Sequence, residues 1–406
     1  MISVDFLEKL LDGVEVIWKA LGDAGEFIRG GGLQKKDFTE TGVGCIHYGQ
    51  IFTHYGMFTE KTKSYVSEEF FKKARKAKKG DLVIATTSEN DEDVCKAVAW
   101  LGHEEIAISS DACIYRHNLN PKYVSYFFRT EEFQKQKRQH ITGTKVRRVN
   151  ADDLAKINIP IPCPDNPKKS LEIQAEIVRI LDAFTELTAE LTAELTAELT
   201  ARKKQYDHYR DQLLSFEDGE VEWKTLGDVL QMRAGQHISA SKIMPSSSDE
   251  YSFPCFGGNG VRGFVENKSH DGEFLLIGRQ GALCGNVQRM KGQFYATEHA
   301  VVVTVSNEID IDWAFHMLTV MNLNQYASQS AQPGLAVGNL QGLKIPLPSI
   351  GEQKRVAQIL DKFDALTHSL TEGLPREIAL RQKQYAYYRD LLLSFPKPEA
   401  PTVAQA

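Results

Sequence analysis

Residues that could carry out covalent or metal chemistry are few in this 406-residue chain, and they lie far apart. Its six cysteines include no CxxC pair, which argues against a disulfide framework and against a zinc site. The sequence has no GxxxxGK[ST] loop for nucleotide phosphates and no Asn/Asp-Pro-Pro-aromatic signature of adenine methylases. We therefore predict no catalytic residue and no metal ligand in this chain.

Composition and length are those of a globular protein with two or three domains, since 42% of the residues are apolar and 25% charged. The first residues do not form a signal peptide, and no run of 18 apolar residues occurs. We expect a reduced, cytoplasmic protein. The net charge of −6 disfavours nucleic-acid binding, yet nine Lys or Arg residues and only two Glu lie within 116–148. That stretch is either a binding surface or a solvated face.

Self-comparison reveals an internal duplication. Residues 174–216 align without a gap to residues 353–395, with 22 of 43 positions identical. The segments before them also correspond, INIPIPCP at 157–164 and LKIPLPS at 343–349, and each predicts a strand that ends in a proline-rich stop. Each repeat thus predicts a strand followed by a long helix.

A second correspondence makes the duplication circular. VIWKALGD at 16–23 resembles VEWKTLGD at 221–228, so the element that follows the first long helix also stands at the N-terminus. For both copies to have equivalent surroundings, the end of the second helix near Phe395 should lie beside the start of the first domain. Two long helices satisfy this condition only if they run antiparallel.

The sequences between these shared parts, 24–155 and 229–340, do not resemble each other. Short apolar runs separated by glycine and polar turns predict strands, with helices near 121–139 and 311–328. The predicted fold class is mixed α/β, with two globular domains separated by two long antiparallel helices that form an intramolecular coiled coil with circular pseudo-twofold organisation. The predicted boundaries are 1–155 for the first domain, 156–216 for the first helical spacer, 217–345 for the second domain, 346–395 for the second helical spacer and 396–406 for a disordered tail.

Apolar spacing in the first long helix predicts a heptad seam through Ile173, Ile177, Ile180, Phe184, Leu187 and Leu191. Ser170 is the predicted N-cap of this helix, and Ser349 with Glu352 forms a capping box for the second. In the second repeat Gly373 and Pro375 align with Glu194 and Thr196, and Pro375 should kink or break that helix.

Three TAEL units occupy residues 188–199, so leucine recurs every four residues at Leu187, Leu191, Leu195 and Leu199. Each unit adds about 6 Å to a helix and advances the leucine stripe by about 40°. We interpret these units as a spacer of adjustable length. A plain coiled coil joining two subunits is the alternative, but two copies within one chain favour intramolecular pairing.

The duplicated ILDxF…QYxxYRDxLLSF helix, the two proline-rich lead-ins and the TAEL repeats resemble the specificity (S) subunit, HsdS, of Type I restriction–modification systems, in the subgroup with TAEL spacer repeats. IGRQGALCG at 277–285 and TEHAVVV at 297–303 are similar to the target-recognition domains of that family. In organisation the resemblance covers residues 1–395.

The resemblance implies that each target-recognition domain reads one half of a bipartite, asymmetric site on double-stranded DNA. The helices would set the half-site spacing and dock two methyltransferase (M) subunits, and two restriction/translocase (R) subunits would complete the endonuclease. The chain itself would be a non-catalytic subunit that binds no cofactor. S-adenosylmethionine, ATP and Mg would belong to partner subunits of the adenine-N6 methyltransferase and ATP-dependent endonuclease, with no role for a membrane.

Base reading requires side chains that make paired hydrogen bonds, and phosphate contacts require Lys, Arg, hydroxyl groups or backbone N–H groups. In the first domain these criteria select Tyr48, Gln50, Thr86, Thr87, Thr144, Lys145, Arg147 and Arg148. In the second domain they select Lys242, Asn259, Arg262, Arg279, Gln280 and Gln332. For each of them, an exposed polar side chain without a role in binding is the alternative.

Two tyrosines and an arginine recur in each long helix, and we interpret them as seam and cap residues or as part of a docking surface for M subunits: Tyr206, Tyr209, Arg210, Tyr385, Tyr388 and Arg389. Two other functions compete with a specificity subunit. A non-DNA coiled-coil adaptor would leave the two unlike, glycine-rich domains unexplained. A stand-alone DNA-modifying enzyme would require the nucleotide or metal signature that this sequence lacks.

Overall fold

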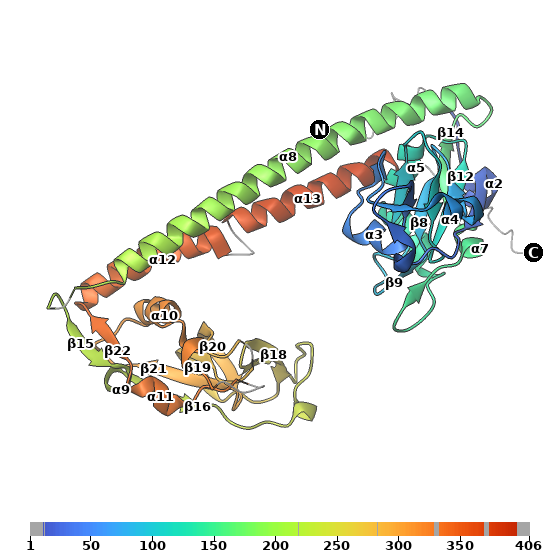
Figure 1. The fold of residues 1–406 in the computed structure, drawn as a ribbon. Coiled ribbons are helices and arrows are strands. Elements are labelled where there is room, and N and C mark those ends of the chain that lie inside the picture. Colours follow the sequence, from blue (N-terminus) through green and yellow to red (C-terminus); the bar gives the residue numbers. More distant parts are fainter. Residues whose placement is uncertain are drawn as a thin grey trace, which may run out of the picture. The chain divides into compact units, whose positions relative to one another are not determined.

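The computed structural model describes residues 11, 13–217, 219–281, 283–328, 333–368 and 373–395. The chain divides into two compact units, one made of residues 1–193 and 379–406 and the other of residues 194–378 (Figure 1). Gln332 and the predicted tail at 396–406 lie outside the described residues. Within the described ranges, no helix combines the length and the apolar character needed to cross a membrane.

The first unit contains two five-stranded sheets. The strand order of one is β2 (Gly25–Arg29), β12 (Ala112–His117), β8 (Leu82–Ala85), β10 (Ala97–Trp100) and β5 (Phe58–Thr59). The order of the other is β3 (Phe38–Thr39), β6 (Ser64–Val66), β4 (Val43–Ile46), β11 (Ile106–Ile108) and β7 (Lys76–Ala77). Strand β8 is fully buried, as the apolar run at its centre predicts.

The second unit contains one six-stranded sheet. Its order is β16 (Leu230–Ala234), β21 (Ala300–Val305), β19 (His270–Gly278), β20 (Val287–Ala296), β17 (Phe253–Gly257) and β18 (Gly260–Val265). The first five strands repeat the order β2-β12-β8-β10-β5, with the same antiparallel pairs and a parallel fifth strand. Two domains whose sequences do not resemble each other therefore share one strand framework.

Short helices complete each domain. Those of the first unit are α2 (Leu21–Ala24), α3 (Tyr48–Thr53), α4 (Glu68–Lys73), α5 (Pro121–Phe127), α6 (Glu131–Arg138) and α7 (Ala151–Leu154). Those of the second unit are α9 (Leu226–Val229), α10 (Ile311–Val320) and α11 (Val337–Gln341). The helix expected near 121–139 is divided into α5 and α6, because the side chain of Thr130 accepts the N–H of Phe133 and caps the start of α6. The helix expected near 311–328 ends at Val320, shortly before Asn322, which has a left-handed φ of 46°.

A two-stranded ladder joins the shared elements in each unit. In the first unit β1 (Val16–Ala20) pairs antiparallel with β14 (Asn158–Pro162), and Trp18 lies opposite Pro160. In the second, β15 (Glu222–Thr225) pairs with β22 (Lys344–Leu347), and Trp223 lies opposite Pro346. The two ladders have the same register, so the N-terminal segment takes the place in the first unit that residues 222–225 take in the second.

The first repeat forms one continuous helix, α8 (Pro167–Leu213), whereas the second forms α12 (Ile350–His368) and α13 (Gly373–Leu392). The predicted interruption is confirmed, because Gly373 has a φ of 72°, which an α-helix does not contain. Pro375 lies in the first turn of α13, where its missing N–H group removes no helical hydrogen bond.

Contacts within each unit show that the long helices are antiparallel. In the first unit the ring of Phe184 stacks on Tyr388 at 5.8 Å, and the hydroxyls of Thr185 and Tyr385 lie 2.9 Å apart. In the second unit Tyr209 stacks on Phe363, also at 5.8 Å. Phe363 and Tyr209 are the repeat counterparts of Phe184 and Tyr388. The same contact occurs twice, and the predicted fold class is confirmed.

The core of each domain includes the end of one long helix, as the circular duplication predicts. Leu392, Leu393 and Phe395, at the end of the second repeat, are buried in one cluster with Leu11 and Leu21 of the first unit. In the second unit the corresponding cluster joins Leu214 to Leu226. The end of each long helix therefore packs into the domain that follows it in the circular order.

Two details of the helix prediction are wrong. Leu187 is 60% exposed, whereas Leu181 is fully buried and Leu191 is half-buried. Thr188 is half-buried in place of Leu187, so the seam advances by four residues from Phe184 instead of three. Asn166 caps α8 in place of Ser170, because the Asn166 carbonyl side chain accepts the N–H of Lys169 at 3.1 Å.

Ser170 lies inside the first turn of α8 and is buried. At the second repeat Ser349 does cap α12, accepting the N–H of Glu352 at 3.4 Å. The carboxylate of Glu352 pairs with Arg355 at the helix surface.

Partial burial of His117 at the end of β12 is expected to make the first unit acid-sensitive. Its Nδ1 accepts the N–H of Leu119 at 3.2 Å, and burial lowers the pKa of the imidazole from 6.5 to about 4, against the smaller opposing effect of Asp81. The unfolded chain therefore binds the proton first as the pH falls below 6.5. We expect the free energy of opening β12 to fall by about 2 kcal/mol between pH 6.5 and pH 5.

Hydrogen exchange of the β12 amides, followed by mass spectrometry of the full chain, measures this loss. H117N is the matched control, since its side-chain oxygen can accept the Leu119 N–H and does not titrate. The loss with pH should be smaller in H117N than in the parent. Equal pH dependence in the two chains would exclude His117 as its source.

Candidate nucleic-acid interface

The turn after the central strand occupies the same place in both domains. Thr86 follows β8, and its N–H donates to the carbonyl of Asp111 at 2.9 Å. Arg279 follows β19, and its N–H donates to the carbonyl of His299 at 3.0 Å. The candidate pairs Thr86–Thr87 and Arg279–Gln280, selected from sequence without any relation between them, are therefore structurally equivalent.

A second loop is anchored beside this turn in each domain. The N–H of Val149 donates to the carbonyl of Thr86 at 3.2 Å, and the N–H of Leu335 donates to that of Arg279 at 2.9 Å. Val149 and Leu335 are buried, so each holds the segment before it against the central strand. These segments contain the candidate loop at 142–148 in the first domain and residues 333–334 in the second.

A polar cleft of about 380 Å³ opens between these loops in the first domain. Its lining carries both charges and several hydroxyl and amide groups, from Arg29, Thr86, Thr87, Ser110, Asp111, Thr142, Arg148, Asn150 and Asp152. Such a surface offers donors and acceptors together, as base edges and phosphates require. Sequence reasoning missed Arg29, although it precedes three glycines, of which Gly30 lies against the carbonyl oxygen of Ser109 and has no room for a side chain.

The 142–148 segment is a hairpin whose tip is exposed. Thr142 and Arg148 exchange two backbone hydrogen bonds of 2.9 Å, and Thr144 and Lys145 are exposed at the tip. Arg148 is exposed and lines the cleft. Arg147 braces the hairpin instead, because its guanidinium pairs with Asp91 at 2.7 Å and donates to the carbonyl of Gly143.

Gln50 and Tyr48 lie at the start of α3. The side-chain oxygen of Gln50 accepts the N–H of His47 at 3.1 Å, and its amide donates to the hydroxyl of Ser64 at 2.6 Å. These contacts favour a structural role for Gln50. The N–H of Tyr48 donates to the hydroxyl of Ser109 at 2.8 Å, which places Tyr48 beside the strand turn that borders the cleft.

In the second domain the β17–β18 turn lies against the turn after β19. A side chain at Gly278 would collide with the carbonyl oxygen of Gly258, so only glycine allows this approach. Asn259 in that turn accepts a hydrogen bond from the amide of Asn286 at 3.0 Å, and Gln280 forms a β-bridge with Gly334. Asn259, Arg279 and Gln280 are thereby brought together.

A second cleft of about 380 Å³ adjoins Asn259 and has a different chemistry. The residues that line it are uncharged, and they include the amides Asn259, Asn286, Asn322 and Asn324. The other two candidates lie near the β18 edge. Arg262 crosses Gly257, and exposed Lys242 precedes Met244, which exchanges backbone hydrogen bonds of 2.9 and 2.8 Å with Phe264.

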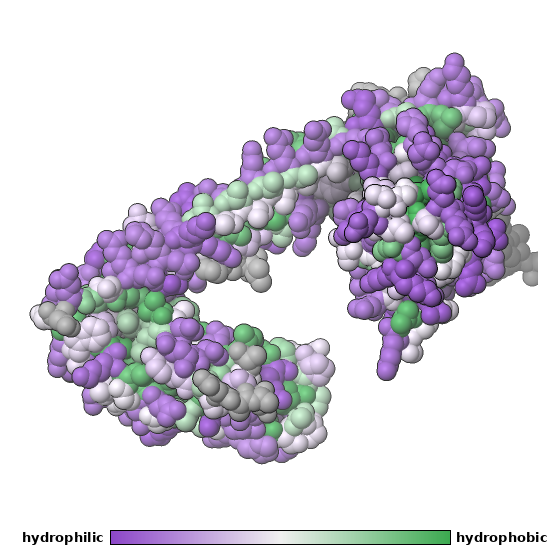
Figure 2. Space-filling view, in the orientation of Figure 1, coloured by the Kyte–Doolittle hydropathy of each residue, from purple (hydrophilic) through white to green (hydrophobic). Residues whose placement is uncertain are grey.

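The basic stretch at 116–148 is mostly engaged within the first unit. Arg116 pairs with Asp81 at 2.9 Å, Lys122 with Asp182 at 2.7 Å and Arg138 with Glu131 at 3.2 Å. Lys137 is fully buried and donates to two backbone carbonyls. Hydrophilic residues cover most of the visible face of this unit (Figure 2).

The four tyrosines that recur in both repeats make contacts at the helix seam or in the core, whereas Tyr387 is 63% exposed. Tyr206 is 5% exposed in the core of the second unit, and the guanidinium of Arg210 lies 5.5 Å from its ring centroid. Tyr209, Tyr385 and Tyr388 make the antiparallel contacts described above. Among the described residues, no three His, Cys, Asp or Glu side chains are grouped as a metal site.

Comparison with known proteins identifies the family. A family model described as the Type I restriction modification DNA specificity domain matches residues 14–201 and 219–380. The chain belongs to this family. As a specificity subunit it is a non-catalytic member of a restriction–modification complex.

Two Escherichia coli specificity subunits are similar over almost the full chain. The EcoprrI subunit is 51% identical over 377 residues, which cover 92% of this chain and 93% of the relative. The EcoR124I/EcoR124II subunit is 37% identical over 434 residues, which cover 98% of this chain and 99% of the relative. A solved chain from work on complex assembly and conformational transition of the type I R-M system shares the fold, with a TM-score of 0.66 at 17% identity and coverage of 93% and 97%.

Proposed function

We propose that each domain of this specificity subunit reads one half of a bipartite, asymmetric site on double-stranded DNA with the loops gathered at the end of its central strand. The equivalence of Thr86–Thr87 and Arg279–Gln280 carries this proposal. One framework presents different side chains at one position in the two domains, which is what two different half-sites require.

The chemistry of these side chains differs between the domains. Arg279 and Gln280 can each make two hydrogen bonds to one base in the major groove. In the first domain the hydroxyl of Thr86 donates to the carbonyl of Asp111 at 3.0 Å and Thr87 is only 8% exposed, so the exposed guanidinium of Arg148 beside them is the group best placed to reach a base. Exposed Lys145 and Lys242 suit phosphate contacts, which position the protein without reading sequence. Gln50 and Arg147 act as structural supports in this proposal.

In this proposal the TAEL units set the spacing of the half-sites, as the resemblance to the subgroup with such repeats implies. Support comes from α8, which remains helical through residues 188–199 and keeps Leu191, Leu195 and Leu199 half-buried. The break at Gly373 lies in the part of the second repeat that aligns with these units. The TAEL run is therefore not matched by an uninterrupted helix.

Two methyltransferase subunits dock on equivalent faces of the long helices, and two restriction/translocase subunits join them. Leu187 is 60% exposed and its repeat counterpart Leu366 is 49% exposed. An exposed leucine at the same repeat position in each unit supports two copies of one partner. S-adenosylmethionine, ATP and Mg belong to those partners, and the complex acts in the cytoplasm.

Replacing either leucine by aspartate tests this docking surface. L187D and L366D should each remove one of two M subunits, with binding about tenfold weaker at the altered face, because a charge replaces an apolar contact. Native mass spectrometry of the complex gives the subunit ratio. A189D adds the same charge about 200° around the helix and should keep both copies. Two M subunits bound to both L187D and L366D would refute the assignment.

Methylation mapping tests the function as a whole. The chain is produced with its partner methyltransferase subunits, and N6-methyladenine is located across a genome. We expect one motif made of two different half-sites separated by unspecified base pairs, and no methylation by the chain alone. A single uninterrupted motif would contradict two-domain reading. Methylation by the chain without partners would favour a stand-alone enzyme.

A further inference from the structure

Each domain is attached to its own long helix at two equivalent points, and the first is a fully buried glutamine. The side-chain oxygen of Gln174 accepts the N–H of Asn120 at 2.8 Å, and that of Gln353 accepts the N–H of Asp310 at 2.8 Å. Asn120 and Asp310 are the N-caps of α5 and α10. The same amide therefore holds the start of the same domain helix in both units.

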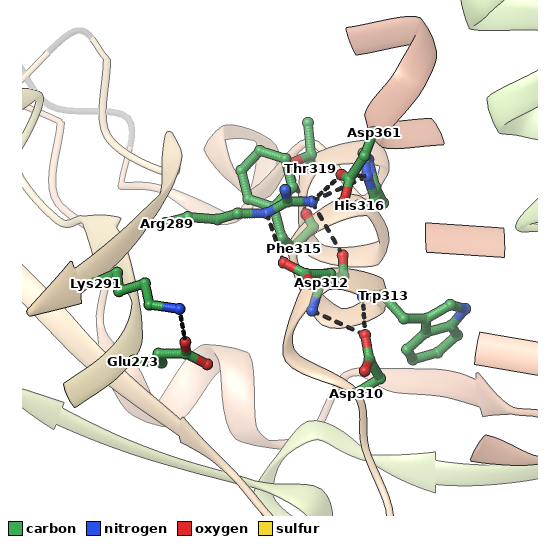
Figure 3. A network of polar contacts seen from close by, with 10 residues as sticks. All are labelled: Glu273, Arg289, Lys291, Asp310, Asp312, Trp313, Phe315, His316, Thr319 and Asp361. Carbon is green, nitrogen blue, oxygen red and sulfur yellow. Dashed lines mark hydrogen bonds and ion pairs between the residues drawn. The ribbon is translucent and has the colours of Figure 1, made fainter. Parts of the chain in front are cut away.

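The second attachment is an aspartate eight residues later, about 12 Å along the long helix. Asp182 accepts hydrogen bonds from Lys122 at 2.7 Å and from the hydroxyl of Tyr126 at 2.8 Å. Asp361 accepts from Nε2 of His316 at 2.7 Å and pairs with the guanidinium of Arg289 (Figure 3). Asp182 and Asp361 are identical positions of the repeat.

Each aspartate binds a cation that also lies over an aromatic ring of the domain. Nζ of Lys122 in α5 is 4.0 Å from the ring centroid of Phe58 in β5. The guanidinium of Arg289 in β20 is 4.1 Å from the ring centroid of Phe315 in α10. In the first domain the helix supplies the cation and the strand supplies the ring, whereas in the second domain the strand supplies the cation and the helix supplies the ring. In both domains these contacts connect the long helix to the sheet. A shared location with different chemistry indicates a shared mechanical role.

Two attachment points fix the rotation of a domain on its helix, which a single point would leave free. Strand β20 lies next to β19, whose end carries Arg279 and Gln280, so a shift of Arg289 moves the strand beside the reading loops. Arg289 also pairs with Asp312 at 3.3 Å in α10, which adds a link from β20 to the domain helix (Figure 3). The attachment thus fixes the orientation of the domain that carries the reading loops on its long helix.

Loss of either carboxylate would leave polar groups without their acceptor. His316 is completely buried, and with Nε2–H donating to Asp361 its imidazole stays neutral, since burial lowers its pKa. Without Asp361, His316 and Arg289 must find new partners, and the domain shifts to allow it. The same reasoning applies to Lys122 and Tyr126 at Asp182.

We propose that Asp182 and Asp361 are positioning residues for DNA reading, each of which sets the angle of its domain's loops and thereby restricts the accepted half-site spacing. This inference rests on the proposed function. The aspartates touch no DNA, so the bases that each domain selects do not depend on them.

The test uses the complete methyltransferase complex and DNA substrates that keep both half-sites while the distance between them varies by one or two base pairs. D182N and D361N retain the side-chain shape and remove the charge. We expect methylation at the parental spacing to fall about tenfold relative to neighbouring spacings, since small displacements of bound groups have effects of this size. Base preference within each half-site should not change.

E352Q is the matched control, because Glu352 is a carboxylate of α12 that pairs only along its own helix surface with Arg355. It should keep the parental spacing preference, and D361E, which keeps the carboxylate, should recover most of it. Equal loss at every spacing in D182N and D361N, or an unchanged preference in both, would overturn the inference. A parent complex that methylates no bipartite site would instead contradict the proposed function.

Discussion

Deletion of one TAEL unit, residues 192–195, is expected to move the preferred half-site spacing to a shorter value and to lower methylation at the parental spacing by about 100-fold or more. Four residues of helix correspond to about 6 Å of rise and about 40° of rotation. Since one base pair of DNA rises about 3.4 Å, the change in length approaches two base pairs.

The deletion should leave the helix intact, because it preserves the four-residue leucine period that keeps Leu191 and Leu199 half-buried. Methylation of substrates with graded spacing, carried out with the M subunits, gives the new optimum. T188A changes one TAEL unit without changing its length and should retain the parental optimum. If the shortened chain keeps the parental spacing as well, the TAEL units are not a spacer.

The architecture could be predicted because the sequence contains long internal repeats. A gapless match over 43 positions and a second match in a shifted register predict paired, antiparallel helices, and the contacts Phe184–Tyr388 and Tyr209–Phe363 confirm them. The shared strand framework of the two domains could not be predicted in this way. Strand order depends on pairing between distant segments, and β8 and β19 have little in common beyond apolar character.

The wrong predictions for single residues also arise from contacts with distant parts of the chain. Leu187 fits a heptad spacing, but the seam passes through Thr188 instead and leaves Leu187 exposed. Gln50 and Arg147 have the side chains of base readers, and only the fold shows that Ser64 and Asp91 engage them. Hydrogen-bond partners supplied by distant segments cannot be read from the residue type alone.

The attachment residues are polar positions that are identical in the two repeats. Gln174, Asp182 and their repeat counterparts are polar residues preserved inside an apolar repeat, where an exposed polar residue would be free to vary between copies. Their burial or pairing against the domains explains their identity in both repeats. At these two repeat positions the matching polar residues are attachment points.

The double substitution R279A/Q280A should lower methylation of the parental site by about 100-fold, because each side chain can contribute about 1–3 kcal/mol of base discrimination. Both residues follow the fully buried end of β19. Arg279 is anchored through backbone hydrogen bonds to His299 and Leu335, and Gln280 through its β-bridge with Gly334. Removal of the side chains leaves those backbone bonds in place. The domain should fold, and the loss should come from reading.

The effect should be confined to one half-site. Substrates randomised in each half separately should show relaxed base preference only in the half read by the second domain. R148A should relax the other half, because Arg148 is exposed and lines the cleft of the first domain. K242A provides a contrast, because loss of a phosphate contact weakens binding to all sequences alike and reduces its salt dependence. Relaxed preference in both halves after R279A/Q280A would mean that one domain does not read one half-site, and that the two-domain division of recognition is wrong.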